Sequence, residues 1–162
     1  MLPMTATTFA ITLVAALGSA AVGGLFYAFS SIVMPGLERM PEAQGIAAMQ
    51  SINVAAPRPP LLVLLMGTGL ACLALIVLAL LDLGAAHSVW LLVGAVVYLV
   101  GTIGLTGARN IPLNDALAEV EPQSHAGAEQ WGRYLDQWTA WNHVRGLAGL
   151  AAGAAFVVAL TV

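Results

Sequence analysis

The densest group of chemically capable side chains lies between Trp131 and Arg145, in the stretch WGRYLDQWTAWNHVR. Arginine and neutral amide groups can hold an oxyanion, and a histidine can move a proton near neutral pH. Tryptophan and tyrosine rings can stack on a flat aromatic molecule. This combination makes the stretch our first candidate for a functional site.

On a helix, this stretch divides into one broad stripe and an opposite wetted face. The wetted face carries Glu129, Arg133 and Asp136, and His143 leans toward it. His143 lies more than a quarter turn around the helix from the centre of the stripe, so it faces a different groove or water. The stripe consists of Trp131, Tyr134, Leu135, Trp138, Asn142 and Arg145, with Trp141 at its edge.

Two stripe residues, Asn142 and Arg145, are poorly explained by an aromatic belt at a bilayer interface. Such a belt is the alternative interpretation of Trp131 and Trp141. Asn142 and Arg145 sit at the first turn of the last apolar segment, on the same stripe as Trp138. An ionisable residue that points inward at mid-bilayer costs roughly 2.5–3.5 kcal/mol on insertion scales. A residue with that cost indicates a functional site or a structural ion pair.

Two further asparagines, Asn110 and Asn114, follow the third apolar segment. Pro112 suits the first turn of a new helix, so Asn110 is either the cap of that helix or a site residue. Asn114 lies one turn further on, where its neutral amide can orient a substrate carbonyl or hydroxyl. Glu38, after the first apolar segment, is a solvated carboxylate, a base or a partner for Arg145.

Composition excludes a soluble protein. The chain has 162 residues, of which 60% are hydrophobic and 8% charged, whereas soluble domains carry about 25% charged residues. The mean hydropathy is +0.91. A net charge of −3 without a basic run excludes nucleic acid as a partner. We therefore predict one integral domain, residues 1–162, embedded in the lipid bilayer of the cell membrane, which in a bacterium is the inner membrane.

The predicted fold is all-α, a bundle of four transmembrane helices capped on one face by two polar connections with short helices. A membrane helix needs about 20 mainly apolar residues. Small residues such as Ala16, Ala20, Gly24, Gly149 and Gly153 recur at helix-packing spacing, which lets helices approach closely and also suits a homo-oligomer. The predicted spans are residues 7–34, 61–81, 89–108 and 144–162.

Four spans place both long connections, residues 35–60 and 109–143, on one side of the membrane. The short turn at residues 82–88 and both termini then lie on the other side. All five arginines fall on the side of the long connections, which the positive-inside rule makes cytoplasmic. Pro41 begins a short helix within the first connection, with one face formed by Ile46, Met49 and Asn53.

Metal chemistry is a second option for the arginine-rich side. His125 and His143 are the histidines on that side, and neither forms a close sequence pair with another histidine or a cysteine. A two-histidine, one-carboxylate iron site would need both of them. We predict no cofactor, and non-haem iron or copper bound through His125 and His143 is the alternative. The carboxylates available to complete such a site are Glu38, Glu42, Asp115 and Asp136.

The order of these stretches resembles that of the anthrone-oxygenase-like family of small four-helix membrane proteins. The resemblance spans nearly the whole chain. One departure is the segment before the second span, where relatives are expected to carry an Asn-Pro pair and this chain has Ala56-Pro57-Arg58-Pro59-Pro60. The residues that carry the resemblance are Phe29–Pro35 with Glu38, Met49–Asn53, Asn110–Asn114, and the tryptophan-to-arginine stretch from Trp131 to Arg145.

The resemblance implies an oxygenase that converts the activated methylene of an anthrone-type substrate to a quinone carbonyl without flavin or haem. Such chemistry needs a base for the acidic C–H proton, donors for the enolate and a dry pocket. We predict His143, Arg145 and Glu38 as catalytic residues. The predicted substrate-binding residues are Asn110, Asn114, Tyr134, Trp138, Trp141 and Asn142.

A different class of function fits the same features. A non-catalytic membrane protein that binds a lipid or another hydrophobic ligand, or an accessory subunit of a membrane complex, would use the same pocket. A hydrophobic small molecule is the expected partner in either case.

Overall fold

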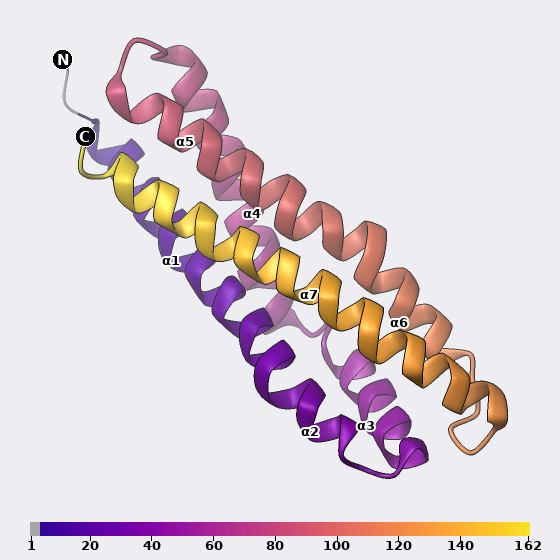
Figure 1. The fold of residues 1–162 in the computed structure, drawn as a ribbon. Helices are drawn as coiled ribbons and strands as arrows, with labels where there is room; N and C mark the ends of the chain where they lie inside the picture. Colours follow the sequence, from indigo (N-terminus) through magenta and orange to yellow (C-terminus); the bar gives the residue numbers. More distant parts are fainter. Residues whose placement is uncertain (1–3) are drawn as a thin grey trace.

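Helices form the architecture of the described part of the protein. The structure is a computed structural model that describes residues 4–162, so the first three residues of the predicted domain lie outside the described part. Residues 4–162 contain no β-strand, which confirms the all-α prediction (Figure 1). Three helices are long and apolar enough to cross a membrane, which indicates a membrane protein: Ala6–Glu38, Pro59–Leu81 and Ala86–Ala118.

The first of these helices runs without a break through α1 (Ala6–Ala28), a π-helical segment η1 (Phe29–Val33) and α2 (Met34–Glu38). The predicted first span ends at residue 34, which places Pro35 outside the helix. Pro35 falls instead in the first turn of α2, where a missing N–H disrupts least because η1 has already shifted the hydrogen-bond pattern. The helix therefore extends beyond the predicted end at residue 34.

The third membrane-crossing helix is also longer than predicted. It joins α5 (Ala86–Val96), η2 (Val97–Gly104), η3 (Thr106–Asn110) and α6 (Ile111–Ala118). Of the two alternatives for Asn110, a helix cap or a site residue, the cap is excluded, because this residue has helical backbone angles (φ −73°, ψ −40°) and its side chain makes no cap hydrogen bond. The π-helical segments carry the chain past Pro112 without a break.

The last helix, α7 (His125–Ala159), has 35 residues and starts at Ser124, whose hydroxyl accepts a hydrogen bond from the backbone N–H of Gly127. The predicted fourth span, residues 144–162, is its C-terminal part. α7 is not among the helices of membrane-crossing composition, because polar and charged residues run as far as Arg145. The fourth span therefore stays a prediction.

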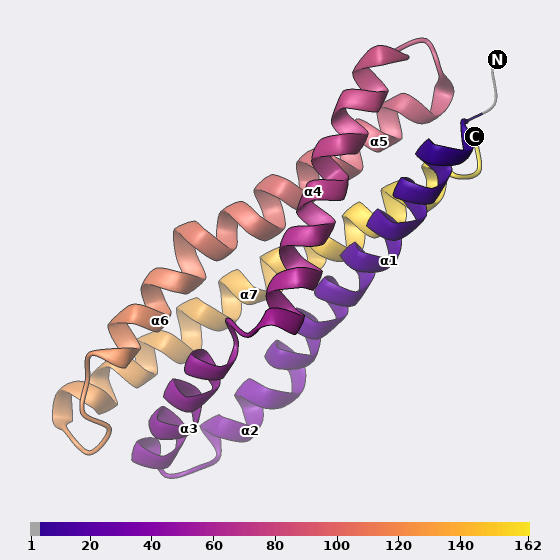
Figure 2. The same cartoon turned by 180° about the vertical axis from the view of Figure 1, so that it is seen from behind.

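The ends of the helices separate the short turn from the long connections. α7 packs along α1, and α5 packs against both α4 (Pro59–Leu81) and α7. Figures 1 and 2 show the start of α1, the α4–α5 turn and the end of α7 at one end of the molecule. α3 (Glu42–Ala55) and the α6–α7 loop lie at the other end. Pro41 directly precedes α3, as predicted.

Small residues bring α1 and α7 into close contact. A Cβ atom added to Gly149 would lie 3.1 Å from the Cα of Gly23, and one added to Gly153 would lie 3.3 Å from the backbone oxygen of Ala16. The predicted small-residue faces are thus used within the chain. Gly24 is an exception, because nothing lies within 4 Å of its added Cβ.

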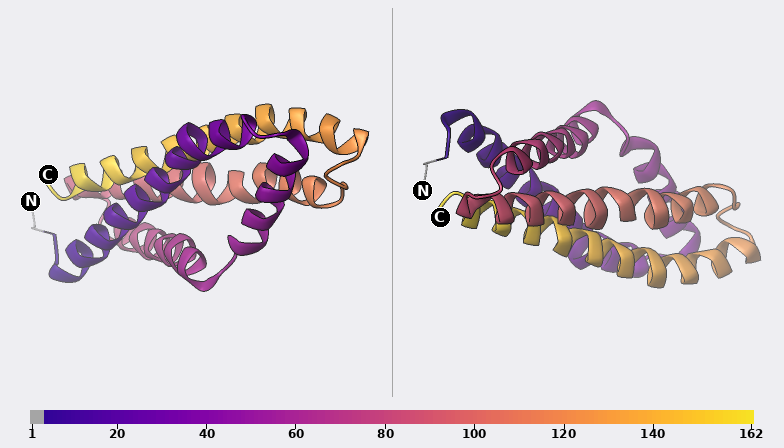
Figure 3. Two further views of the ribbon diagram at one scale, coloured as in Figure 1. Left: turned by 90° about the horizontal axis from the view of Figure 1, so that it is seen from below. Right: turned by 90° about the horizontal axis from the view of Figure 1, so that it is seen from above.

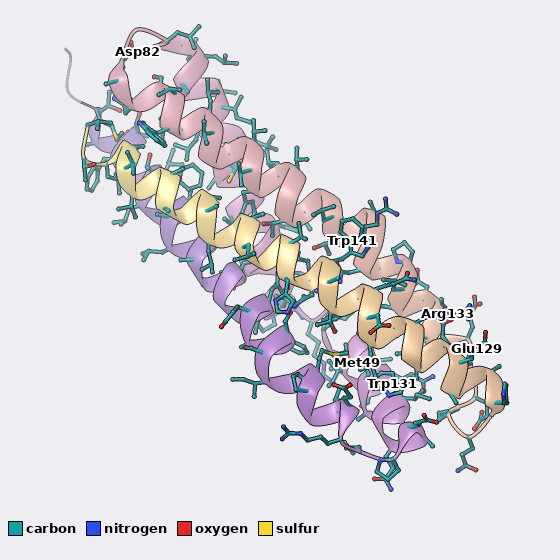
Figure 4. The ribbon with its side chains drawn as sticks, viewed as in Figure 1. Met49, Asp82, Glu129, Trp131, Arg133 and Trp141 are labelled. Atoms are coloured by element: carbon teal, nitrogen blue, oxygen red, sulfur yellow. The ribbon has the colours of Figure 1, made fainter. Side chains whose placement is uncertain are left out.

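A second hydrophobic cluster lies at the end of the molecule that carries α3. Figure 4 shows Met49 of α3 and Trp131 of α7 in this region, far from Asp82 in the α4–α5 turn. Trp131 is buried, so its interpretation as part of an interfacial belt is wrong. The cluster consists of Met34, Leu37, Ile46, Met49, Leu117, Trp131, Tyr134 and Trp138.

Candidate functional site

A pocket of about 630 Å³ lies where α1, the α3–α4 corner, α6 and α7 meet. Figure 3 shows this corner standing away from α1 and α7. Most of the lining side chains are apolar and a few are polar, as in typical small-molecule sites. The polar lining residues are Gln50, Asn53, Thr106, Asn114, Asp115 and Arg145.

Arg145 is the buried cation of this pocket, with 6% of its surface exposed. Its Nε and Nη2 donate to Oδ1 of Asn142 at 2.8 and 2.6 Å, and its Nη1 donates to Oγ1 of Thr106 at 3.1 Å. An arginine has five N–H donors, so two of them donate to no atom among residues 4–162. The guanidinium carbon lies 3.9 Å from the ring centroid of Phe26 and 5.2 Å from that of Trp138, within cation–π range.

The charge of Arg145 is not compensated by a carboxylate of the described chain. The salt bridge found within residues 4–162 joins Arg133 to Glu129 on the exposed face of α7, where Figure 4 shows both residues. Glu38 is exposed and does not pair with Arg145. A buried cation without a partner is unfavourable unless a charge or dipole compensates it, so this position favours an anionic or strongly polar ligand group.

Asn142 holds Arg145 from behind and does not line the pocket. It is fully buried, and its Nδ2 donates to the backbone oxygen of Phe26 at 2.6 Å and to Oγ of Ser30. These two bonds fix the orientation of the amide, because only the oxygen is then free to accept from the guanidinium. Asn142 thus supports Arg145 in this structure, and its predicted contact with substrate stays a prediction.

A second polar wall is built around Tyr134. Its hydroxyl donates to Oδ1 of Asn114 at 2.8 Å and accepts from Nδ2 of Asn53 at 3.5 Å. Burial raises the pKa of Tyr134 well above its ordinary value, so the group stays a neutral phenol. Gln50 donates to the backbone oxygen of Leu117 at 2.8 Å, which ties α3 to α6. These hydrogen bonds hold the amides of Gln50, Asn53 and Asn114 on the pocket surface.

The aromatic stripe of α7 is stacked mainly on itself. The ring centroids of Trp131 and Tyr134 lie 5.7 Å apart, and those of Tyr134 and Trp138 lie 5.6 Å apart, with nearly parallel planes. Trp138 is the member of this stack that lines the pocket, together with Phe26 and Phe29. Tyr134 lies behind Asn114. Among the aromatic residues predicted to bind substrate, Trp138 is the one that lines this pocket.

Two other predicted residues lie outside the pocket lining. Trp141 is half-buried, and the guanidinium of Arg109 lies 4.8 Å from its ring centroid; Figure 4 shows it on the side of α7 that faces α6. Asn110 is fully buried, and its Nδ2 donates to the backbone oxygen of Trp138 at 3.2 Å. Within the described chain its Oδ1 and the Nε1 of Trp138 have no hydrogen-bond partner.

The two predicted bases are not brought to the pocket. His143 is exposed on α7. Glu38 lines a separate recess of about 110 Å³ beside Asp136. Asp115, which sequence reasoning considered only as a metal ligand, is the carboxylate that lines the large pocket in the part of the chain described here.

The structure also keeps the two candidate metal ligands apart. His125 and His143 are both exposed on one straight helix, and about five turns, roughly 27 Å, separate them. Residues 4–162 contain no group of three histidine, cysteine, aspartate or glutamate side chains arranged to hold a metal ion.

Thr106, Asn53 and Gln50 line the pocket although sequence reasoning did not select them as site residues. Asn53 had been placed correctly on the inner face of α3. Thr106 could have been predicted only if the third span had been continued past Arg109 as one helix. On such a helix, Thr106 and Asn114 lie on the same side.

The comparisons identify one family. The anthrone oxygenase family matches residues 61–155, more than half of the chain. The matched part contains Thr106, Asn114, Asp115, Trp138 and Arg145, and thus the α6 and α7 walls of the pocket. No curated protein and no solved structure matches the chain.

Proposed function

Because the chain belongs to the anthrone oxygenase family, which suggests an oxygenase-like function, we propose that it oxidises a hydrophobic aromatic substrate of the anthrone or hydroquinone type within the membrane. One observation carries the proposal: a buried Arg145 with two unused N–H groups forms the wall of an otherwise apolar pocket. Such a group suits an oxygen that becomes negative during the reaction.

The reaction we propose balances with dioxygen as the co-substrate. A base removes one proton from the methylene of the anthrone, and the electron pair moves toward the ring carbonyl, which becomes an enolate oxygen. The enolate carbon reduces dioxygen and forms a carbon–oxygen bond, which gives a hydroperoxide after protonation. Loss of water from the hydroperoxide leaves a new carbonyl. One methylene and one dioxygen thus give one carbonyl and one water.

Arg145 would hold the enolate oxygen. Its guanidinium is fixed in place by Asn142 and Thr106, so little reorganisation is needed when the negative charge develops. The largely apolar lining lowers the local dielectric constant, which strengthens the interaction. Trp138 and Phe29 would contact the faces of the ring.

Asp115 is the base that we propose in place of His143 and Glu38. It lies on α6, about two and a half turns or roughly 13 Å from Thr106 along the same helix. The carbonyl and the methylene of an anthrone stand at opposite edges of its central ring. In the proposed pose, an anthrone whose oxygen rests on Arg145 turns its methylene toward the α6 wall, which carries Asp115. The amides of Asn53 and Asn114 would orient further oxygens of the substrate.

The proposal needs no bound cofactor, because the substrate enolate itself donates the electrons to dioxygen. It includes a fourth membrane span, the C-terminal part of α7, and a cytoplasmic position for the end that carries α3 and the α6–α7 loop. All the arginines of the chain fall on that side of such a four-span arrangement.

The test is oxidation of an anthrone by the purified protein in lipid nanodiscs, followed as quinone absorbance and dioxygen uptake. Arg145→Met should lower kcat by about 10²–10³-fold, the range for loss of an oxyanion donor. Asp115→Asn should lower it by about 10²–10⁴-fold, the range for loss of a general base. Arg133→Met and Glu119→Gln alter exposed residues outside the pocket lining and should retain activity. Full activity of Arg145→Met would end the proposal.

A non-catalytic hydrophobic-ligand binder is the second candidate, and the largely apolar lining of the pocket favours it. It predicts saturable anthrone binding without quinone formation above the uncatalysed rate. Metal analysis of the same preparation addresses the cofactor. Stoichiometric iron or copper, with activity that disappears on chelation, would replace the cofactor-free reaction.

A further inference from the structure

We infer that the ligand of this pocket is an aromatic head that carries a hydrocarbon chain, and that the chain leaves the pocket between α1 and α4 into the lipid. The identity of the aromatic head depends on the proposed function. The presence of the hydrocarbon chain is inferred from the pocket walls alone.

Five exposed lining residues lie on α3, the α3–α4 corner and α6: Val54, Pro57, Ile111, Asp115 and Ala118. Three others mark a mouth between α1 and α4, because they line the pocket and are also exposed on the outside of the protein. They are Leu25 on α1, which is 37% exposed, and Leu62 and Met66 on α4, which are 42% and 45% exposed. Both helices belong to segments of membrane-crossing composition. A mouth framed by apolar side chains of two such helices opens toward lipid and not toward water.

The spacing between α1 and α4 explains why a mouth exists at this level. The two helices touch at Gly18, where an added Cβ would overlap the side chain of Thr68. About two turns further toward α3, Leu25 and Leu61 line the pocket instead. Figure 3 shows the start of α4 standing away from α1, in the corner with α3. The helices therefore separate where the pocket begins.

The pocket is larger than an aromatic head requires. A tricyclic ring system occupies about 250 Å³ at the packing density of organic crystals, whereas the pocket measures about 630 Å³. The polar lining side chains belong to α3, η3, α6 and α7. The lining residues of α1 and α4 are apolar: Leu25, Phe26, Leu61, Leu62, Leu65 and Met66.

This division of the walls selects the chemistry of the second part of the ligand. A hydroxylated or charged substituent against the α1–α4 wall would lose its hydrogen bonds to water and gain no partner. A hydrocarbon chain loses nothing there, because lipid on the outside of the mouth is as apolar as the wall. The advantage of the mouth is entry from the bilayer without a passage through water.

Binding of two ligands tests the inference: an anthrone, and the same anthrone with a decyl chain on an outer ring. Both are measured without dioxygen, so that no turnover occurs, by displacement of radiolabelled anthrone from protein in nanodiscs. Concentrations are expressed per lipid. Leu62→Trp places a bulky ring at the mouth. Val63→Trp is the matched control, because Val63 is the next residue on α4, is 70% exposed and does not line the pocket.

We expect Leu62→Trp to weaken binding of the decyl anthrone at least tenfold more than binding of the plain anthrone. Val63→Trp should change the ratio of the two affinities less than twofold. Equal weakening of both ligands, or of neither, would overturn the inference. Met66→Trp repeats the test if Leu62→Trp does not fold. In the wild type, a photoreactive group midway along the chain should label the peptides that contain Leu25, Leu62 or Met66; labelling confined to α5 or α7 would also overturn it.

Failure of the proposed function gives a different result. If neither ligand is oxidised in air while the binding ratio changes as expected, the oxygenase proposal fails and the chain-bearing ligand stands. If both ligands are oxidised while Leu62→Trp leaves the ratio of their affinities unchanged, the oxygenase proposal stands and the hydrocarbon-chain inference is refuted.

Discussion

The side-chain oxygen of Asn142 accepts hydrogen bonds from both Nε and Nη2 of Arg145, at 2.8 and 2.6 Å. The amide nitrogen of the same residue donates to the backbone oxygen of Phe26 and to Oγ of Ser30. Asn142 therefore connects α1 and η1 to the cation of the pocket. A residue in this position must accept on one side and donate on the other, which an amide does and a carboxylate cannot.

Asn142→Asp is expected to lower kcat by at least tenfold, with a smaller change in KM. The new carboxylate would neutralise the positive charge of Arg145, which we propose to stabilise the enolate. It would also face the oxygens of Phe26 and Ser30 without a proton to donate to them. The measurement is anthrone oxidation under the conditions given for Arg145→Met. Gln137→Glu makes the same change on the exposed face of α7 and should be neutral. Wild-type activity of Asn142→Asp would show that the charge of Arg145 does not stabilise the enolate.

Tyr134→Phe is expected to change stability differently at neutral and at alkaline pH. Burial raises the pKa of Tyr134 in the folded state, whereas an unfolded tyrosine ionises near pH 10. Above about pH 10 the unfolded state loses this proton and the folded state keeps it, so the unfolding free energy falls by about 1.4 kcal/mol per pH unit. Below pH 10 the group makes no such contribution.

The variant should therefore have a shallower alkaline loss of stability than the wild type. At neutral pH it should be less stable by about 1 kcal/mol, because the hydrogen bond to Asn114 is lost while the ring stack remains. Unfolding in a mild detergent at neutral pH and above pH 10 measures both effects. Tyr27→Phe, on an exposed side chain, is the control. Identical pH dependence in Tyr134→Phe and the wild type would show that this phenol does not govern the alkaline limb.

Local periodicity accounts for the parts of the site that could be predicted from sequence. The stripe of α7 is buried from Trp131 to Arg145, and its opposite face with Glu129 and Arg133 is exposed. Both follow from 3.6 residues per turn and need no knowledge of other helices. The same reasoning placed Asn53 inward on α3. Exposure of His143 also agrees with its position off the stripe.

The length of the third helix and the residues that line the pocket depend on features that periodicity does not reveal. The π-helical segments carry the helix through Pro112 and change which side chains face inward, so Asn110 became a buried contact of Trp138 and not a cap. The position of Asp115 on the pocket wall depends on where the α3–α4 corner stands, and that contact joins residues far apart in the chain. A pattern along one helix cannot report which other helix supplies the facing wall.

The contact between α1 and α7 gives the last prediction, through the neighbouring glycines Gly23 and Gly24. A Cβ at position 23 would lie 2.7 Å from the backbone nitrogen of Leu150 and 2.9 Å from the backbone oxygen of Gly146. Backbone atoms of a packed helix cannot move aside as a flexible side chain can. Gly23→Ala should therefore push α1 away from α7 and destabilise the protein by about 1–3 kcal/mol, the range for overpacking.

Gly24→Ala is the matched control, because nothing lies within 4 Å of its added Cβ. It should be neutral or stabilise the protein by up to about 1 kcal/mol, since alanine is the better helix former. Thermal unfolding of both variants in the same detergent measures the difference. Gly23→Ala should also lower anthrone oxidation, because Phe26, one turn further on, accepts from Asn142 and packs on Arg145. Equal stability of the two variants would contradict the close α1–α7 contact and, with it, the support that holds Arg145 at the pocket.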